Sequence, residues 1–296
     1  MNQRIRGYVD LLRPFTLLAP LVVSSCVMIA SFVYTGKLDF SFSTIVLTIL
    51  AASFTLALVN GASNALNQAT DLNEDRLSKP YRPIPRGIIT SKEAKMIASV
   101  LYVCAFLLSL TVHLLFATFV GTIMVFSITY SIFPRMKRVL FMNQLWVALP
   151  RGLFGILASW SVFSNPFQPV PIAIGSIAAL FLFGGTTTKD ILDAHADKTA
   201  GIQTLVNVVG VKTTACIACL CMSTSFLMIP LLIMFNVLAL YLLPLALLTV
   251  LAVYIAWLMT HNKKNERYEN TSSWTLMYTT YLLFALGFAF LTISFS

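Results

Sequence analysis

Long apolar runs recur along this 296-residue chain, and short polar segments separate them. Each run is close to the roughly 20 residues that an α-helix needs to cross the hydrocarbon core of a bilayer. The runs lack the alternation of apolar and polar positions that marks membrane β-barrel strands, so helices must satisfy the backbone in lipid. The pattern therefore predicts an all-α integral membrane protein. Nine spans are predicted, at residues 15–34, 43–65, 94–112, 113–133, 143–163, 168–188, 213–234, 236–259 and 274–294.

The composition agrees with this interpretation. The chain is 58% hydrophobic and 10% charged, with a mean hydropathy of +0.83, whereas soluble domains contain roughly 25% charged residues. Since no long linker or charged tail divides the sequence, one membrane-embedded domain is expected over residues 1–296. The first apolar run is too long for a signal peptide and further spans follow, so it is predicted to be an uncleaved helix. The five cysteines all fall in predicted spans, which favours packing residues over a disulfide framework.

The positions of the positive charges predict the orientation in the membrane. Of the twenty lysines and arginines, eighteen precede the first span or follow the second, fourth, sixth and eighth spans. Such asymmetry is typical of cytoplasmic loops, so the N-terminus is predicted to be cytoplasmic and the C-terminus to lie outside. Lys37 lies on the opposite side, and Arg151 lies within a span. The net charge of +9 is therefore explained by topology, and we expect no nucleic-acid partner.

The most highly charged segment of the chain, Asn60–Gly87, follows the second span. In it, Asn67, Asp71 and Asp75 are spaced four and four, which on a helix stacks the three side chains on one face. Two carboxylates and an amide that converge in this way favour a site for a hard divalent cation.

A second acidic group follows the sixth span. Asp190, Asp193 and Asp197 have spacings of three and four and are predicted to share one helical face. Two facing carboxylate clusters would repel each other unless cations lay between them, and Mg²⁺ suits such a site because it leaves positions for phosphate oxygens. The alternative is that either cluster only solvates a polar loop. The expected metal ligands are Asn67, Asp71, Asp75, Asp190, Asp193 and Asp197.

Basic residues surround both acidic groups. Lysine and arginine beside metal-binding carboxylates are what a diphosphate requires, because it accepts charge-assisted hydrogen bonds. The alternative is that these residues only set the topology. The candidate diphosphate-binding residues are Asn67, Lys79, Arg82, Arg86, Lys137, Arg138 and Lys189.

Several motifs together resemble the UbiA family of intramembrane prenyltransferases. They are Asn67-x-x-x-Asp71-x-x-x-Asp75, RP-x-x-x-G at Arg82–Gly87, Tyr130-Ser131 with Lys137-Arg138, KD-x-x-D-x-x-x-D at Lys189–Asp197, and Arg13-Pro14 at the start of the first span. The similarity covers nearly the whole chain. Gln68 and the pair His195-Ala196 depart from residues common in the family, but neither departure removes a spaced aspartate.

The resemblance implies nine helices around a central cavity, with the active site facing the cytoplasm. It implies transfer of an isoprenyl group, of geranylgeranyl type, from its diphosphate to a hydrophobic or amphipathic acceptor among membrane lipids, with Mg²⁺ as two ions. Ionisation of the donor to an allylic cation is the expected route. The implied catalytic residues are Asp71, Asp75, Asp193, Asp197 and Tyr130, the last near the reacting carbon. Arg13 is the implied counterpart of a residue near the acceptor.

Arg151 is an intramembrane charge, and such charges are rare and usually functional. One hypothesis is that it faces the cavity and binds an anionic group of the acceptor; the other is that it snorkels or pairs with backbone carbonyls.

The acceptor remains open at the level of sequence: a glycerol-phosphate lipid, a quinone or chlorin precursor, or an aromatic acid such as hydroxybenzoate. From another class of protein, the alternative is a lipid or isoprenoid transporter. Transporters place ionisable groups near the midplane, whereas here the acids lie at the ends of spans.

Overall fold

The computed structural model describes residues 2–36, 41–261 and 271–295, and every regular element in these ranges is helical. Local sequence explains where several helices begin. Proline occupies the first position of two of them, at Pro14 and Pro169, where its missing N–H costs no hydrogen bond. Thr90 and Glu93 form a reciprocal capping box at the start of a third.

Eight segments of the described chain are long and apolar enough to cross a membrane. They comprise α2 (Pro14–Thr35), α3 (Phe42–Thr70), α5 (Ser91–Val112), α6 (Leu114–Ser131), α9 (Pro169–Gly185) continued by α10 (Thr187–Thr199), α11 (Leu205–Met234), the 3₁₀ segment η3 (Leu240–Leu247) continued by α12 (Leu248–Thr260), and α13 (Ser272–Phe295). The other elements are α1 (Gln3–Leu12), α4 (Leu72–Ser78), the 3₁₀ turn η1 (Met136–Arg138), α7 (Met142–Ala148), the π-helical turn η2 (Leu149–Leu153) and α8 (Phe154–Ser161). The prediction of an all-α, multi-pass membrane protein is confirmed.

The predicted fifth span, residues 143–163, is divided into α7, η2 and α8. Pro150 within η2 has no backbone N–H to donate, which accounts for the local change from α- to π-helical hydrogen bonding. The predicted seventh span begins earlier than expected, because α11 extends back to Leu205 through a kink at Gly210 (φ 80°). The basic residues at 263–267 and Lys37 lie outside the described residues.

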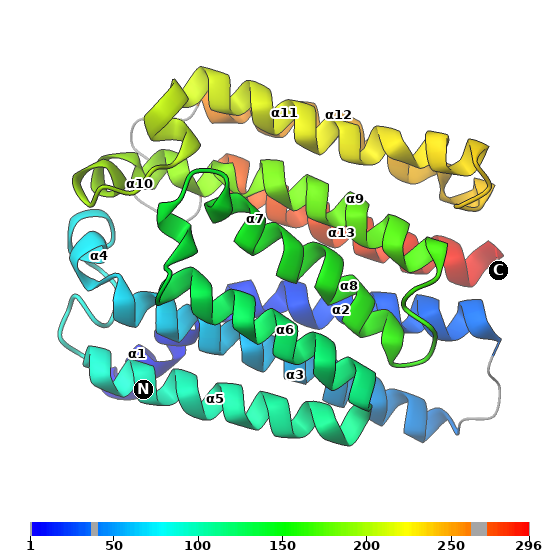
Figure 1. Cartoon of the computed structure of the whole chain (residues 1–296), viewed down its shortest axis with the longest axis horizontal. Helices are drawn as coiled ribbons and strands as arrows, with labels where there is room; N and C mark the ends of the chain where they lie inside the picture. Colours follow the sequence, from blue (N-terminus) through cyan, green and yellow to red (C-terminus); the bar gives the residue numbers. More distant parts are fainter. Residues whose placement is uncertain (1, 37–40, 262–270, 296) are drawn as a thin grey trace.

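The helices lie side by side along the length of the molecule (Figure 1). Their buried apolar side chains form two clusters, one built mainly from α2, α9, α11, α12 and α13, the other from α3, α5 and α6. The segment α8 contributes to both, with Trp160 in the first cluster and Leu157 in the second. Large side chains such as Leu47 and Val250 are exposed on the outside, as expected for a surface that contacts lipid.

The polar elements gather at one end of the bundle. In Figure 1, α4 and α10 lie together at the left, beyond the ends of α3 and α9, and α4 packs against α10. The N-terminus lies toward this end and the C-terminus at the other, as an odd number of passes requires. The nine-pass path and its orientation stay predictions.

The nine-pass path can be tested by fusing to the chain a fluorescent protein that folds only in the cytoplasm. We expect a fusion after Ser296 to be dark and a truncated fusion after His261 to fluoresce, because the positive loop between the last two spans is predicted to be cytoplasmic. Whole-cell fluorescence, normalised to protein amount, measures both. A bright fusion at Ser296 would show that one of the nine segments does not cross.

Candidate active site

A cavity of about 280 Å³ lies between the helices and opens among the polar elements. Further along the helices its wall includes apolar side chains, among them Val23 of α2, Leu56 of α3, Ile123 of α6 and Leu182 of α9. At the polar end it is lined by charged side chains from α4 and α10. The cavity therefore joins a charged mouth to a chamber suited to an apolar chain.

The structure brings most of the predicted site residues to this one cavity. Its lining includes Arg13, Asn67, Asp71, Asp75, Lys79, Arg82, Tyr130, Lys137, Arg151, Lys189, Asp190, Asp193 and Asp197. Two predicted diphosphate-binding residues are absent from it. Arg86 is exposed and borders a separate shallow pocket beside α1, and Arg138 is exposed and lies 3.7 Å from Glu74.

The first acidic group does not lie on one continuous helix, so that part of the prediction is wrong. Helix α3 ends at Thr70, and Asp71 has non-helical dihedral angles (φ −106°, ψ 21°) before α4 begins. The four-residue hydrogen bonding nevertheless continues across the break. The Asp71 N–H donates to the Asn67 carbonyl at 3.0 Å, and the Asp75 N–H to the Asp71 carbonyl at 2.8 Å. The three side chains therefore stay close although the chain changes direction.

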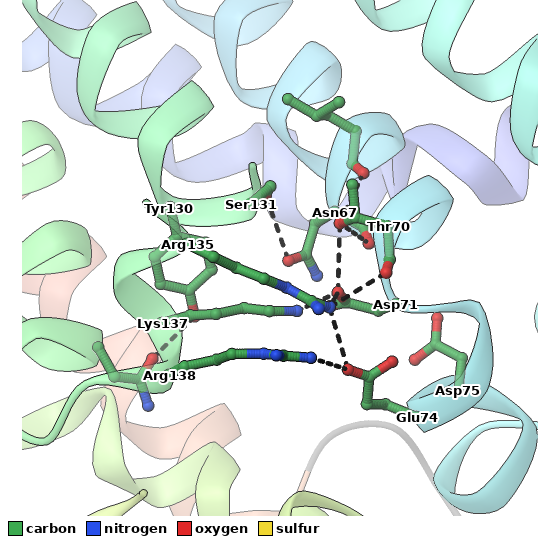
Figure 2. Close-up of polar contacts among 12 residues, drawn as sticks. Asn67, Thr70, Asp71, Glu74, Asp75, Tyr130, Ser131, Arg135, Lys137 and Arg138 are labelled. Carbon is green, nitrogen blue, oxygen red and sulfur yellow. Dashed lines mark hydrogen bonds and ion pairs between the residues drawn. The ribbon is translucent and has the colours of Figure 1, made fainter. Parts of the chain in front are cut away.

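Basic side chains from the loop after α6 neutralise Asp71. The Lys137 ammonium forms an ion pair with its carboxylate, and Arg135 donates to the same oxygen at 3.0 Å. Arg135 also donates to Glu74 at 3.0 Å and to the Thr70 carbonyl at 3.1 Å. Figure 2 shows Arg135, Lys137 and Arg138 extending side by side toward these acids. Asp71 is thus held between α3 and the η1 turn by charge-assisted bonds.

Asp75 forms a buried pair with Arg82. One guanidinium nitrogen of Arg82 lies 2.9 Å from each carboxylate oxygen, and both side chains are buried. Burial raises the pKa of the Asp75 carboxyl above its usual value, and the charge of Arg82 opposes that rise. Burial likewise lowers the pKa of Lys137, which Asp71 opposes. Both charges are therefore kept by their partners rather than by solvent.

The second acidic group lies on α10 as predicted, with Asp190, Asp193 and Asp197 all within that one helix. Asp190 is buried and accepts from the side-chain amides of Gln144 at 3.2 Å and Asn143 at 3.4 Å. Amide donors at these distances satisfy a buried carboxylate without adding positive charge. Asp190 is therefore fixed to the start of the fifth span.

Tyr130 occupies the centre of a small network beside Asp190. Its hydroxyl donates to the Asn143 side-chain oxygen at 2.8 Å and accepts from the Lys189 ammonium at 2.9 Å. The same ammonium lies 5.4 Å from the centre of the Tyr130 ring. The ring is thus held in one orientation at the boundary between the charged mouth and the apolar chamber.

One ion pair joins the two acidic groups. Lys79, which follows α4, pairs with Asp193 of α10. The cations between the facing carboxylates are therefore lysine and arginine side chains in this structure. Among the described residues no three Asp, Glu, His or Cys side chains are arranged to hold a metal ion as they stand.

Four residues of this network are not among the predicted site residues: Glu74, Arg135, Asn143 and Gln144. A signal exists for the last two, because adjacent amides at the start of an apolar span are unusual. For Glu74 and Arg135 the sequence carries no comparable signal, because charged residues are common in any cytoplasmic loop.

Fold and site together define a membrane-embedded transferase with a charged mouth over an apolar chamber. The model of the UbiA prenyltransferase family matches residues 22–278. The chain belongs to this family and is a prenyltransferase.

Relatives with two different activities are similar to the chain. The digeranylgeranylglyceryl phosphate synthase of Methanosphaera stadtmanae is 25% identical over 286 residues, 95% of this chain and 98% of that protein. The 4-hydroxybenzoate octaprenyltransferase of Aliivibrio fischeri is 34% identical over 128 residues, 41% of each chain. Among solved structures, a UbiA homologue from Archaeoglobus fulgidus bound to GPP and Mg²⁺ has a TM-score of 0.70 and 18% identity, over 97% of this chain and 98% of that one.

The two arginines at Arg82 and Arg86 give a matched test of the site. Arg82→Ala removes the partner of a buried carboxylate and is expected to lower the free energy of unfolding by about 3–5 kcal/mol. Arg86→Ala removes an exposed charge and is expected to change it by less than about 0.5 kcal/mol. Denaturant unfolding in detergent micelles measures both.

The cost of Arg82→Ala should shrink as the pH falls. Burial places the pKa of Asp75 above its usual value, and a protonated carboxyl no longer needs a cationic partner. Equal destabilisation by the two variants, or a cost for Arg82→Ala that grows in acid, would contradict the assigned pairing.

Proposed function

We propose that the chain transfers an isoprenyl group from a polyprenyl diphosphate of geranylgeranyl type to an acceptor inside the membrane, with Mg²⁺. One observation carries the proposal. Acidic segments that are more than a hundred residues apart, at Asp71–Asp75 and Asp190–Asp197, meet across the mouth of one cavity among lysines and arginines. The apolar wall beyond that mouth is suited to a prenyl chain.

The residues at the mouth fit Mg²⁺ by the chemistry of their donor atoms. Asn67, Asp71 and Asp75 on one side, and the three aspartates of α10 on the other, offer the oxygen ligands that Mg²⁺ prefers. Two Mg²⁺ ions held by these residues would neutralise the charge that develops on the leaving diphosphate. Asp71 and Asp193 now pair with Lys137 and Lys79, so metal binding would free these two ammonium groups.

The freed lysines, with Lys189 and Arg82, would bind the diphosphate oxygens by charge-assisted hydrogen bonds. Arg86 and Arg138 are outside this proposed site, because they do not line the cavity. The C1–O bond of the donor breaks with its electron pair on the diphosphate, and the acceptor nucleophile bonds to C1 and gives up its proton to the released diphosphate.

Tyr130 would face the reacting carbon. Its ring is fixed by Asn143 and Lys189 at the inner edge of the mouth, and an aromatic face stabilises a nearby cation. The apolar side chains beyond it would exclude water, which otherwise would capture the allylic cation.

We further propose that the mouth faces the cytoplasm, because the basic loops of the predicted topology gather at that end.

A prenylated glycerol phosphate is the favoured acceptor, since the full-length similarity is to digeranylgeranylglyceryl phosphate synthase. An aromatic acid is the second candidate, supported by the shorter match to the hydroxybenzoate enzyme. A transporter is disfavoured because the acids lie at one end of the bundle.

The two acidic groups can be tested separately. Asp71→Ala and Asp193→Ala are each expected to lower the rate of magnesium-dependent diphosphate release from geranylgeranyl diphosphate by at least about 100-fold, because each removes charge stabilisation from the leaving group. The measurement uses purified protein in lipid nanodiscs with an acceptor extract.

Asp10→Ala on the exposed face of α1 is the matched control and should keep full turnover. Unfolding temperatures of all three variants show that they are folded. Full activity in either cavity variant, or turnover that does not depend on magnesium, would refute the proposed magnesium and diphosphate site.

A further inference from the structure

Arg151 lines the same cavity but far from its charged mouth. It lies in η2, eight residues beyond Asn143, which holds Asp190 at the mouth. At about 1.5 Å per residue this places it roughly 12 Å deeper along the helix. Its side chain is exposed, and it borders the cavity inside the bundle. It is therefore an intramembrane cation in contact with the substrate chamber.

No acidic side chain neutralises Arg151. The titratable groups near its guanidinium are four tyrosines, Tyr102, Tyr130, Tyr278 and Tyr281. Among the described residues, no hydrogen bond or ion pair joins the guanidinium to another group, and the snorkelling or carbonyl-paired alternative finds no support there. Lys79, Arg82 and Lys137 at the mouth, by contrast, each have a carboxylate partner.

The backbone directs this side chain into the cavity. On the next residue, a Cβ added to Gly152 would lie 2.5 Å from the backbone of Ala179, so α9 contacts the helix on that side. The hydroxyl of Tyr281 donates to the Arg151 carbonyl at 2.9 Å and fixes the π-helical turn. Turns of this kind recur at functional sites. Arg151 is thus held away from α9, facing the chamber.

Three of the four tyrosine hydroxyls near Arg151 have already donated their protons. The fourth, on Tyr102, has no partner among the described residues, but it is buried and does not line the cavity. Tyr130 donates to Asn143, Tyr278 to the Phe15 carbonyl and Tyr281 to the Arg151 carbonyl. Two serines that line the cavity behave in the same way, with donations from Ser127 to Ile123 and from Ser159 to Gly155. A hydroxyl whose proton is committed can only accept, so an anion bound here would take its hydrogen bonds from the guanidinium.

We propose that Arg151 binds an anionic oxygen group of the prenyl acceptor, a phosphate or a carboxylate, and so selects charged over neutral acceptors. The inference rests on the proposed function. Tyr130 accepts a hydrogen bond from Lys189 at the mouth and lines the same cavity as Arg151, so the donor's reacting carbon and the anchored acceptor would meet beside its ring. Arg151 takes no part in bond making; its role is binding.

Paired acceptors test this assignment in the full-length protein with geranylgeranyl diphosphate and Mg²⁺. The phosphate pair is geranylgeranylglyceryl phosphate and geranylgeranylglycerol; the carboxylate pair is 4-hydroxybenzoate and 4-hydroxybenzyl alcohol. Arg151→Gln is expected to raise the KM of the charged member by about 10- to 100-fold, as for loss of a charge-assisted hydrogen bond. The KM of the neutral member and of the donor should stay within about threefold.

The pair that responds identifies the group as phosphate or carboxylate. Arg151→Lys should restore part of the preference, and Arg86→Gln, at an exposed arginine outside the cavity, should change nothing. A rise in donor KM would instead assign Arg151 to the diphosphate site, and equal effects on charged and neutral acceptors would show a structural role. Either result would overturn the inference.

A binding measurement separates this inference from the proposed function. Without donor, the fluorescence of Trp146 and Trp274, which line the cavity, reports the Kd of each acceptor. We expect Arg151→Gln to raise the Kd of the charged acceptor by the same factor as its KM, whether or not turnover occurs. Absence of prenylated product from the wild type with unchanged acceptor binding would refute the function alone, whereas equal Kd values in wild type and variant for both charged acceptors would refute the role of Arg151.

Discussion

Like charges face each other at one end of an otherwise apolar bundle, and this constraint shapes the site. Two acidic groups converge on one opening, and they can do so only because cations lie between them. Lys79 joins α4 to α10 through Asp193, while Arg135 and Lys137 join the η1 turn to Asp71. These contacts connect the two apolar clusters at the polar end of the bundle. The same electrostatic demand that ties the elements would be met by the metal ions and diphosphate of the proposed function.

The buried pair of Asp75 and Arg82 differs from the lysine pairs in how readily its partners can exchange. Removing both charges from water is costly, so the pair contributes less to stability than its short distances suggest. Asp71 and Asp193 are paired with lysines instead, and a lysine on a flexible stem can change partners more readily than a planar guanidinium. Arg82 thus supports the frame of the mouth, while Lys79 and Lys137 are the cations that can move to a ligand.

Periodicity and charge alone predicted much of this molecule, and the failures have physical causes. Hydropathy located the spans because a bilayer requires a minimum apolar length, but it could not detect that Pro150 would divide the fifth span into α7, η2 and α8. Residue spacing correctly predicted that the second acidic group lies on one helix, whereas no local pattern indicated the break at Asp71, after which α4 packs against α10. Arg86 and Arg138 were grouped with Arg82 because the sequence does not show in which direction a charged side chain points. Only the fold shows that Arg86 and Arg138 do not line the cavity, although Arg138 reaches Glu74 at its edge.

The same electrostatics explain why the cation inside the chamber is an arginine, Arg151. An ammonium placed without a carboxylate in a chamber of tyrosines and aliphatic side chains loses its proton readily, because desolvation penalises the charged form. A guanidinium keeps its charge under such conditions and offers two parallel donors that match a carboxylate or phosphate. A diphosphate at the mouth and an anionic acceptor below it would also repel each other, so each needs its own cations. Lysines that can exchange partners at the mouth and a permanently charged arginine in the interior satisfy both requirements within one cavity.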